Sequence, residues 1–326
     1  MKRVLTAGLF ALIGIASAFA QTSTGQTSAG QEIWTERPYD PPIGSRWIVQ
    51  VESDSEEKRQ DGARTIQVRS KSEFTVDEKL PTGFRISYVN RELNVEGTAP
   101  AVALLGPAFA GMKDIVVRAT TDKTGKPVEV DNIGEVQAVM RTVIERTVGA
   151  FKDKPQLADV LQRLMTGMLI VDGKQAALAY LEELPQLSLG QSTGLKPGEE
   201  RRETEEAPSP LGGLPIKSNT TLRIDNADAQ TGKVRLVRTR SLDPEAVRGL
   251  ALNIVRQMGV AVDKPMPPEV FEVMKAMQFS IDNRLEINVE DGITRALREQ
   301  TTTTVNAVGH AYTKHERKQV TVSPAL

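Results

Sequence analysis

The two histidines are the first residues to consider, because imidazole can bind metals and transfer protons near neutral pH. His310 and His315 lie five residues apart in a run that alternates as a strand does. An odd spacing places side chains on opposite faces of a strand, so the two rings cannot readily share a metal. The chain has no cysteine, no H-E-x-x-H, no G-x-S-x-G and no glycine-rich phosphate loop. The sequence therefore predicts no metal, no cofactor and no nucleophilic triad.

Paired acids are the second candidate for chemistry, and they occur at Glu56-Glu57, Glu182-Glu183 and Glu205-Glu206. Glycoside hydrolysis needs two carboxylates held across a cleft. Such a cleft usually also offers aromatic platforms, and the chain has only two Trp, four Tyr and eight Phe. We interpret these acids as solvated faces and predict that the protein is not an enzyme. A hydrolase with an unrecognised site is the least favoured alternative.

Methionines gather in the segments expected to be helical. Methionine is flexible and polarizable, so it suits an adaptable apolar cavity, although it suits an ordinary core equally well. The leading hypothesis is a non-catalytic protein that binds an apolar or amphipathic ligand, such as a lipid or an acylated molecule, or a cell-envelope protein, between a sheet and its helices. The residues expected to line that cavity by apolar contact are Met140, Val143, Leu161, Met165, Met168, Leu250 and Met258.

The N-terminus indicates where the protein acts. Lys2 and Arg3 precede a short apolar run, and Ala18-Phe19-Ala20 supplies the small residues that a signal peptidase recognises. Residues 1–20 are therefore expected to be a signal peptide, and the protein to be exported, most simply to a periplasm. Without them, 41 basic residues fall to 39 against 42 acidic ones, a net charge of −3. That balance argues against nucleic acid as a partner, and the mature chain has no apolar run long enough to span a membrane.

The mature chain is expected to be one domain after a polar leader. Residues 21–43 are rich in Gln, Ser, Thr, Gly and Pro, and predict a flexible leader whose end Trp34 and Tyr39 could pin to the domain. The domain is expected to span 44–326, either as a unit or as two similar halves, 44–190 and 199–326. The charged, Gly- and Pro-rich stretch 189–213 would join them as a loop containing the start of a strand.

Alternating apolar residues predict strands on both sides of a helical block. The alternation runs through Trp47, Val49 and Val51, and recurs near 66–76, 84–88, 115–130, 220–239, 279–289, 293–304 and 309–322. Apolar stripes at helical spacing predict helices over 133–151, from Pro155, over 176–184 and from Pro244. Long antiparallel meanders with inserted helices indicate an α+β fold, with a large curved antiparallel sheet and helices packed on one face.

A predicted helix cap and an apolar segment bear on how the helices lie against the sheet. Asn132 and Glu135 have the spacing of a capping box at the start of the first helix. The apolar segment 99–112 is either a buried core helix, which we favour, or an exposed lid. An exposed 99–112, a protruding 189–213 and a filled core would instead favour an envelope assembly or scaffolding protein that acts through its outer surface.

Two features of the sequence resemble exported bacterial proteins of uncharacterised function that are built on long antiparallel strands. They are the hairpin Asp122-Lys-Thr-Gly-Lys-Pro-Val-Glu-Val130, which leads to a capped helix, and the closing three strands. The general plan of those proteins is similar to that of the periplasmic lipoprotein-carrier family, in which a curved sheet wraps helices around an acyl-binding cavity. The resemblance covers roughly residues 44–322 and implies fold and cavity only. It transfers no individual functional residue.

Overall fold

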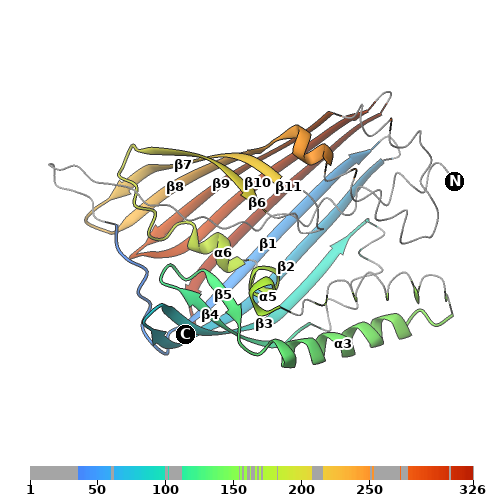
Figure 1. The fold of residues 1–326 in the computed structure, drawn as a ribbon, viewed down its shortest axis with the longest axis horizontal. Helices are drawn as coiled ribbons and strands as arrows, with labels where there is room; N and C mark the ends of the chain where they lie inside the picture. The colour runs from blue at the N-terminus through green and yellow to red at the C-terminus, as the bar shows by residue number, and fades with distance from the viewer. Residues whose placement is uncertain are drawn as a thin grey trace.

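Eleven strands form one antiparallel sheet in the computed structural model (Figure 1). The structure describes residues 36–59, 62–99, 112–153, 172–181, 183–207, 216–249, 278–307 and 310–325, with a few single residues between these ranges. The strands are β1 (Arg46–Arg59), β2 (Gly62–Leu80), β3 (Gly83–Gly97), β4 (Val116–Asp122), β5 (Pro127–Val130), β6 (Glu200–Ala207), β7 (Ile216–Asp228), β8 (Lys233–Leu242), β9 (Gln278–Glu290), β10 (Ile293–Ala307) and β11 (His310–Pro324).

The first and last strands meet in the middle of the sheet. The order is β5-β4-β3-β2-β1-β11-β10-β9-β8-β7-β6, so β5 and β6 form the edges and the sheet is open. β1 pairs with β11 from Trp47↔Pro324 to Lys58↔Thr313. Each half, β1–β5 and β6–β11, is a meander of consecutive strands, because every other pairing joins neighbours in the chain.

The predicted alternation is confirmed, with one side of the sheet facing the core. On β1, Trp47, Val49 and Val51 are at most 6% exposed, while their neighbours point to the opposite face. A single cluster joins these residues to apolar side chains from both halves of the sheet, and we call this side the inner face. The stretch 189–213, predicted to hold the start of a strand, contains β6, which pairs with β7.

Among the described residues, three helices pack on the inner face, as predicted: α3 (Ile133–Gly149), α5 (Gly173–Tyr180) and α6 (Glu183–Ser188) (Figure 1). Residues from each helix belong to the core cluster, among them Val136, Ala177 and Leu187. The helix predicted over 176–184 is two short helices, separated at Leu181, which is fully buried. These observations confirm the α+β fold with a large curved sheet and helices on one face.

The capping box predicted at the start of α3 does not form. The Asn132 side chain caps no backbone N–H of the helix. Its amide instead donates to the Val116 carbonyl at 2.9 Å and accepts from the Arg118 N–H at 2.8 Å, so it ties the helix start to β4. Asp172 does cap α5, accepting from the Lys174 and Gln175 N–H groups. Asp243 caps the helical turn at 244–249 in the same way, as its spacing predicts.

Residues 36–40, which we call the N-terminal strap, run across one end of the sheet. They lie within the segment predicted to be flexible, but polar and aromatic contacts far apart in sequence hold them. Glu36 accepts from the Gly194 N–H at 2.8 Å, and Arg37 pairs with Asp291. Tyr39 packs edge-on against Phe84 with 5.3 Å between ring centroids, as its predicted pinning role requires. Burial raises the pKa of the Tyr39 phenol. Trp34 lies outside the described residues.

Charged side chains cover the opposite face of the sheet in cross-strand ladders. One ladder centres on Glu73, which pairs with Arg46 and, at 3.4 Å, with Arg91. The hydrogen bond from Arg46, reinforced by the charges of Arg46 and Arg91, holds the pKa of Glu73 below its ordinary value of 4.5. A carboxylate with a lowered pKa stabilises the fold above its unfolded-state pKa, and this contribution is lost as the pH falls through the folded-state value.

Glu73→Gln is therefore expected to reduce stability at pH 7 and to flatten the loss of stability below about pH 4.5, because the neutral amide cannot titrate. Urea unfolding midpoints measured between pH 7 and pH 3 test this. Arg46→Gln should likewise reduce the loss of stability below about pH 4.5. If both variants lose as much stability on acidification as the native protein does, this ladder does not contribute to the acid sensitivity.

Candidate ligand-binding face

The inner face changes character along the strands. One register row across six strands is wholly apolar, and none of its residues is more than 4% exposed: Ile224, Leu236, Ile287, Leu297, Val320 and Val51. Such a row is the ordinary lining of a core under helices. Beyond it the inner face becomes mixed, because Leu222 and Leu285 stay apolar while Arg238, Glu299 and Lys318 are charged.

Two adjacent rows of the inner face carry these polar residues, and we call them the polar rows. The first contains Arg238, Leu285, Glu299 and Lys318; the second contains Thr220, Arg240, Asn283, Thr301 and Glu316. Arg238, Arg240, Asn283, Glu299 and Thr220 are all at most 7% exposed. Burying charge is costly unless partners compensate it, so two such rows on the core side of a sheet need a physical reason.

Glu299 is the centre of the hydrogen-bond network. Its carboxylate accepts from Asn283 Nδ2 at 2.6 Å and from Gln186 Nε2 of α6 at 3.3 Å. Lys318 lies directly opposite it on β11. The short helix α6 is thus connected to the polar rows as well as to the apolar core.

A second contact joins α6 to the polar rows. Lys318 Nζ lies 3.9 Å from a Glu183 carboxylate oxygen, and the Tyr88 hydroxyl donates to the same carboxylate at 3.3 Å. The Glu183 side chain is only 13% exposed. The interpretation of Glu182-Glu183 as a solvated face is therefore wrong at Glu183, because α6 turns this carboxylate toward Lys318.

In the part of the chain that the structure describes, Asn283 Oδ1 and the Thr220 hydroxyl oxygen of the second row have no hydrogen-bond partner. The Asn283 amide cannot be reversed to satisfy its oxygen, because its Nδ2 faces the Glu299 carboxylate, which only accepts. Arg240 lies between these two residues in register. An unsatisfied buried polar atom costs about 1–3 kcal/mol, so natural proteins rarely keep one without a use.

A small apolar pocket lies beside α6, on the opposite side of the apolar row from the polar rows. Its lining combines sheet and helix residues: Tyr39, Phe74, Gly125, Leu184, Leu187, Ser188, Gln191, Ile293, Thr294 and Val322. Its empty volume is about 290 Å³, with open solvent included. Because that volume includes open solvent, it is not comparable with the roughly 300–1,000 Å³ of small-molecule sites. The enclosed part has room for about one water molecule, so a ligand chain could enter only if the lining side chains moved apart.

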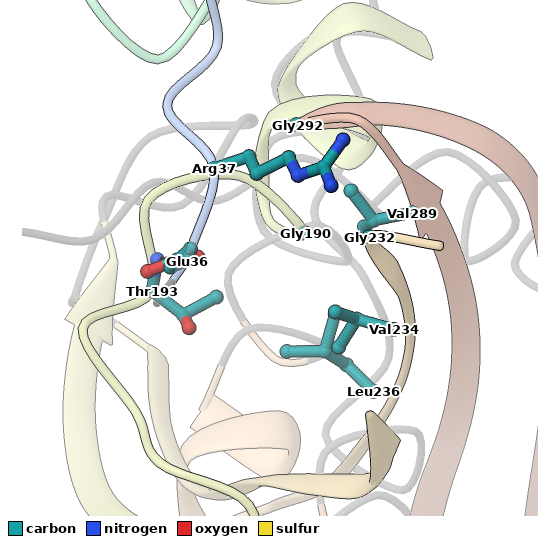
Figure 2. A pocket seen from close by; sticks show the side chains of 9 residues that line it. All are labelled: Glu36, Arg37, Gly190, Thr193, Gly232, Val234, Leu236, Val289 and Gly292. Carbon is teal, nitrogen blue, oxygen red and sulfur yellow. Dashed lines mark hydrogen bonds between the residues drawn. The ribbon is translucent and has the colours of Figure 1, made fainter. Parts of the chain in front are cut away.

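Figure 2 shows a neighbouring pocket beneath the N-terminal strap. Arg37 extends over it toward Gly232 and Gly292, while Val234 and Leu236 form its apolar wall. Its empty volume is about 320 Å³, with open solvent included. The charged groups at its mouth are engaged in holding the strap, since Glu36 binds backbone N–H groups and Arg37 pairs with Asp291. We interpret this pocket as part of the strap's seat.

Of the seven residues predicted to line a cavity, two lie in the part of the chain that the structure describes. Met140 is 8% exposed and belongs to the main core cluster, whereas Val143 packs in a separate small cluster with Ile144. Neither lines the two pockets above. Leu161, Met165, Met168, Leu250 and Met258 lie outside the described residues, as does most of the 99–112 segment. Their role as ligand contacts stays a prediction.

The polar rows were not predicted from the sequence. A usable signal was present, since Arg238 and Arg240 have the same strand parity as the buried Val234 and Leu236. A charged residue that continues the inward parity of a strand is a candidate for a buried functional group. The same parity links Asn283 to Leu285 and Ile287 on β9.

In the part of the chain that the structure describes, no group of three or more His, Asp or Glu side chains could hold a metal ion. His315 is exposed and lies with its Nδ1 3.3 Å from the Thr302 hydroxyl. Among the described helices, none is both long and apolar enough to cross a membrane.

The fold and the candidate face define an α+β protein with an open antiparallel sheet. No protein-family model and no curated protein matches the chain. Among solved structures it is similar to DynF from the dynemicin biosynthesis pathway of Micromonospora chersina, with 8% identity, 91% of this chain and 92% of that chain covered, and a TM-score of 0.20. It is also similar to an outer membrane channel from Pseudomonas putida F1, with 8% identity, 91% and 100% coverage, and a TM-score of 0.19.

Proposed function

We propose that this is an exported, non-catalytic protein that binds an amphipathic ligand between its sheet and helices. The observation that carries the proposal is the environment of α6. Leu184 and Leu187 of this helix line the apolar pocket, while Glu183 and Gln186 bond to the polar rows. Six helical residues span about 9 Å, so the apolar and polar zones lie within one short amphiphile of each other.

The general plan supports the same proposal. The antiparallel sheet with helices on its inner face is similar in plan to the periplasmic lipoprotein-carrier family, which the sequence resembles. A signal-like N-terminus would suit a carrier in the cell envelope. The ligand would be a lipid or an acylated molecule. Its chain end would widen the pocket beside Leu187, and its polar part would face the polar rows that Gln186 and Glu183 contact.

The first test is native mass spectrometry with lipid extraction, on the full chain exported and purified without detergent. A co-purifying acyl species near one per chain is expected. A clean apo mass, with no uptake of a fluorescent fatty acid, would rule the proposal out and leave an envelope scaffold that acts through its outer surface as the better account.

A filled pocket should weaken fatty-acid uptake. Ile293 lines the apolar pocket and is only partly buried, so Ile293→Trp can fill the space with limited damage to the core. It is expected to reduce uptake at least fivefold. Val139→Trp is the matched control, because Val139 is 43% exposed on α3 and is not among the residues that line the pocket. Equal uptake by both variants would place the ligand elsewhere.

A further inference from the structure

We propose that the N-terminal strap competes with the ligand for one place in the apolar pocket. The Tyr39 ring occupies the position that the apolar chain of the ligand takes, and the strap lifts when the ligand binds. This inference rests on the proposed function, since it concerns access to the same pocket. The enclosed part of that pocket has room for about one water molecule, so a chain can enter only if part of the lining moves.

Tyr39 is the part of the strap that lines the apolar pocket. Its ring lies edge-on to Phe84, with 5.3 Å between ring centroids, and packs against the main core cluster. A Cβ at Gly125 would lie 2.7 Å from Tyr39 Cε1, so the ring also fits closely against the β4–β5 turn. The other apolar side chains of the lining are Phe74, Leu184, Leu187, Ile293 and Val322. Removal of the ring would therefore leave a larger space with apolar walls.

The strap also covers the neighbouring pocket that Figure 2 shows. Glu36 and Arg37 line that pocket, and Tyr39 lines the apolar one. The two pockets adjoin across the β9–β10 hairpin, because Val289 of the first pairs in register with Thr294 of the second. A strap that lifts would thus uncover two adjacent pockets at the same end of the sheet.

The strap is anchored mainly through polar contacts that face solvent. Arg37 pairs with Asp291 and Asp40 pairs with Lys79, and each of these four side chains is about half exposed. Water and salt screen exposed ion pairs, so such pairs add little to stability. Glu36 accepts hydrogen bonds from backbone N–H groups of the loop after α6, and water can replace these bonds once the strap lifts.

The ligand would replace the main apolar contact that the strap gives up. Tyr39 has the largest apolar side chain among residues 36–40. When its ring leaves, the walls of the pocket meet water, which is unfavourable, and a bound chain covers them again. A ligand that binds only the lifted form has its apparent affinity reduced by the fraction of molecules in that form. Removal of the ring should therefore tighten binding.

The first test measures the affinity of the exported protein and four variants for a fluorescent fatty acid. Tyr39→Ala removes the ring and is expected to raise the affinity at least fivefold. Tyr39→Phe keeps the ring and should lack this gain. Arg37→Gln loosens the strap and should raise the affinity about twofold, which also serves if Tyr39→Ala fails to fold. Arg235→Gln is its matched control, because it breaks an ion pair on the opposite face of the sheet.

The second test follows the strap directly with chymotrypsin, which cleaves after aromatic residues. Saturating fatty acid is expected to accelerate cleavage after Tyr39 at least threefold in the native chain, because cleavage of a transiently open segment tracks the open population. An unchanged cleavage rate, or no gain in affinity for Tyr39→Ala, would overturn the competition and leave the proposed function standing. If neither the native chain nor Tyr39→Ala binds the fatty acid, both proposals are wrong.

Discussion

Gly292→Ala is expected to be among the most destabilising single substitutions in this protein, with a loss of about 3 kcal/mol. Gly292 has φ +73° in the β9–β10 turn, a conformation that costs a residue with a Cβ about 1 kcal/mol. A Cβ there would also lie 2.3 Å from the Pro38 carbonyl oxygen of the strap. Backbone atoms cannot move aside as a flexible side chain can, so the substitution must displace the strap or the hairpin.

Gly198→Ala separates these two costs. Gly198 also has a positive φ, +83°, but a Cβ there meets nothing within 4 Å. It should therefore lose only the conformational part, about 1 kcal/mol. Free energies of unfolding from urea titration of both variants measure the difference, which reports how firmly the strap is seated. Equal losses would mean that the strap contributes little to stability.

Asn283→Leu is expected to cost about 2–4 kcal/mol, because it leaves the buried Glu299 carboxylate without its shortest hydrogen bond. The cost comes from leaving the buried Glu299 carboxylate without a hydrogen-bond donor, and not from losing the amide group itself. The double variant Asn283→Leu/Glu299→Leu should therefore recover much of the lost stability. Chemical denaturation of the two single variants and the double variant completes the cycle.

Asn288→Leu is the matched control for that cycle. Asn288 lies on the same strand, β9, but on the exposed face, so its replacement should change stability by no more than about 0.5 kcal/mol. If Asn283→Leu were equally mild, Glu299 would have to be satisfied by other groups, and the polar rows would not be a tightly coupled network.

Much of the fold could be predicted from alternation. The inward parity of Trp47, Val49 and Val51 on β1 is visible in the sequence and correctly predicts a strand with one buried face. The central pairing of β1 with β11 could not be predicted, because register between strands so distant in the chain depends on which meander edges are left open. Asn132 shows a similar limit, since its tertiary bonds to β4 replace the local cap that its spacing predicts.

The candidate site was harder to predict from the sequence than the fold, because its residues are of types that usually face solvent. Arg240, Asn283 and Glu299 are residue types that usually face solvent, so a composition-based interpretation places them on the surface. Only their strand parity and the alignment of β8, β9 and β10 bring them together on the inner face. The methionine hypothesis is limited differently, because five of its seven residues fall outside the described part of the chain.

The meeting of the two end strands at the centre of the sheet has a kinetic consequence. Within each meander every pairing is between neighbours, so both halves can form from contacts of short sequence separation. The β1–β11 junction instead closes a loop of nearly the whole chain, and such closure slows folding. A circular permutant cut near Gly198 and joined through the native termini would make chain order equal to sheet order for all eleven strands. It would thereby replace the pairing of greatest sequence separation by one between consecutive strands.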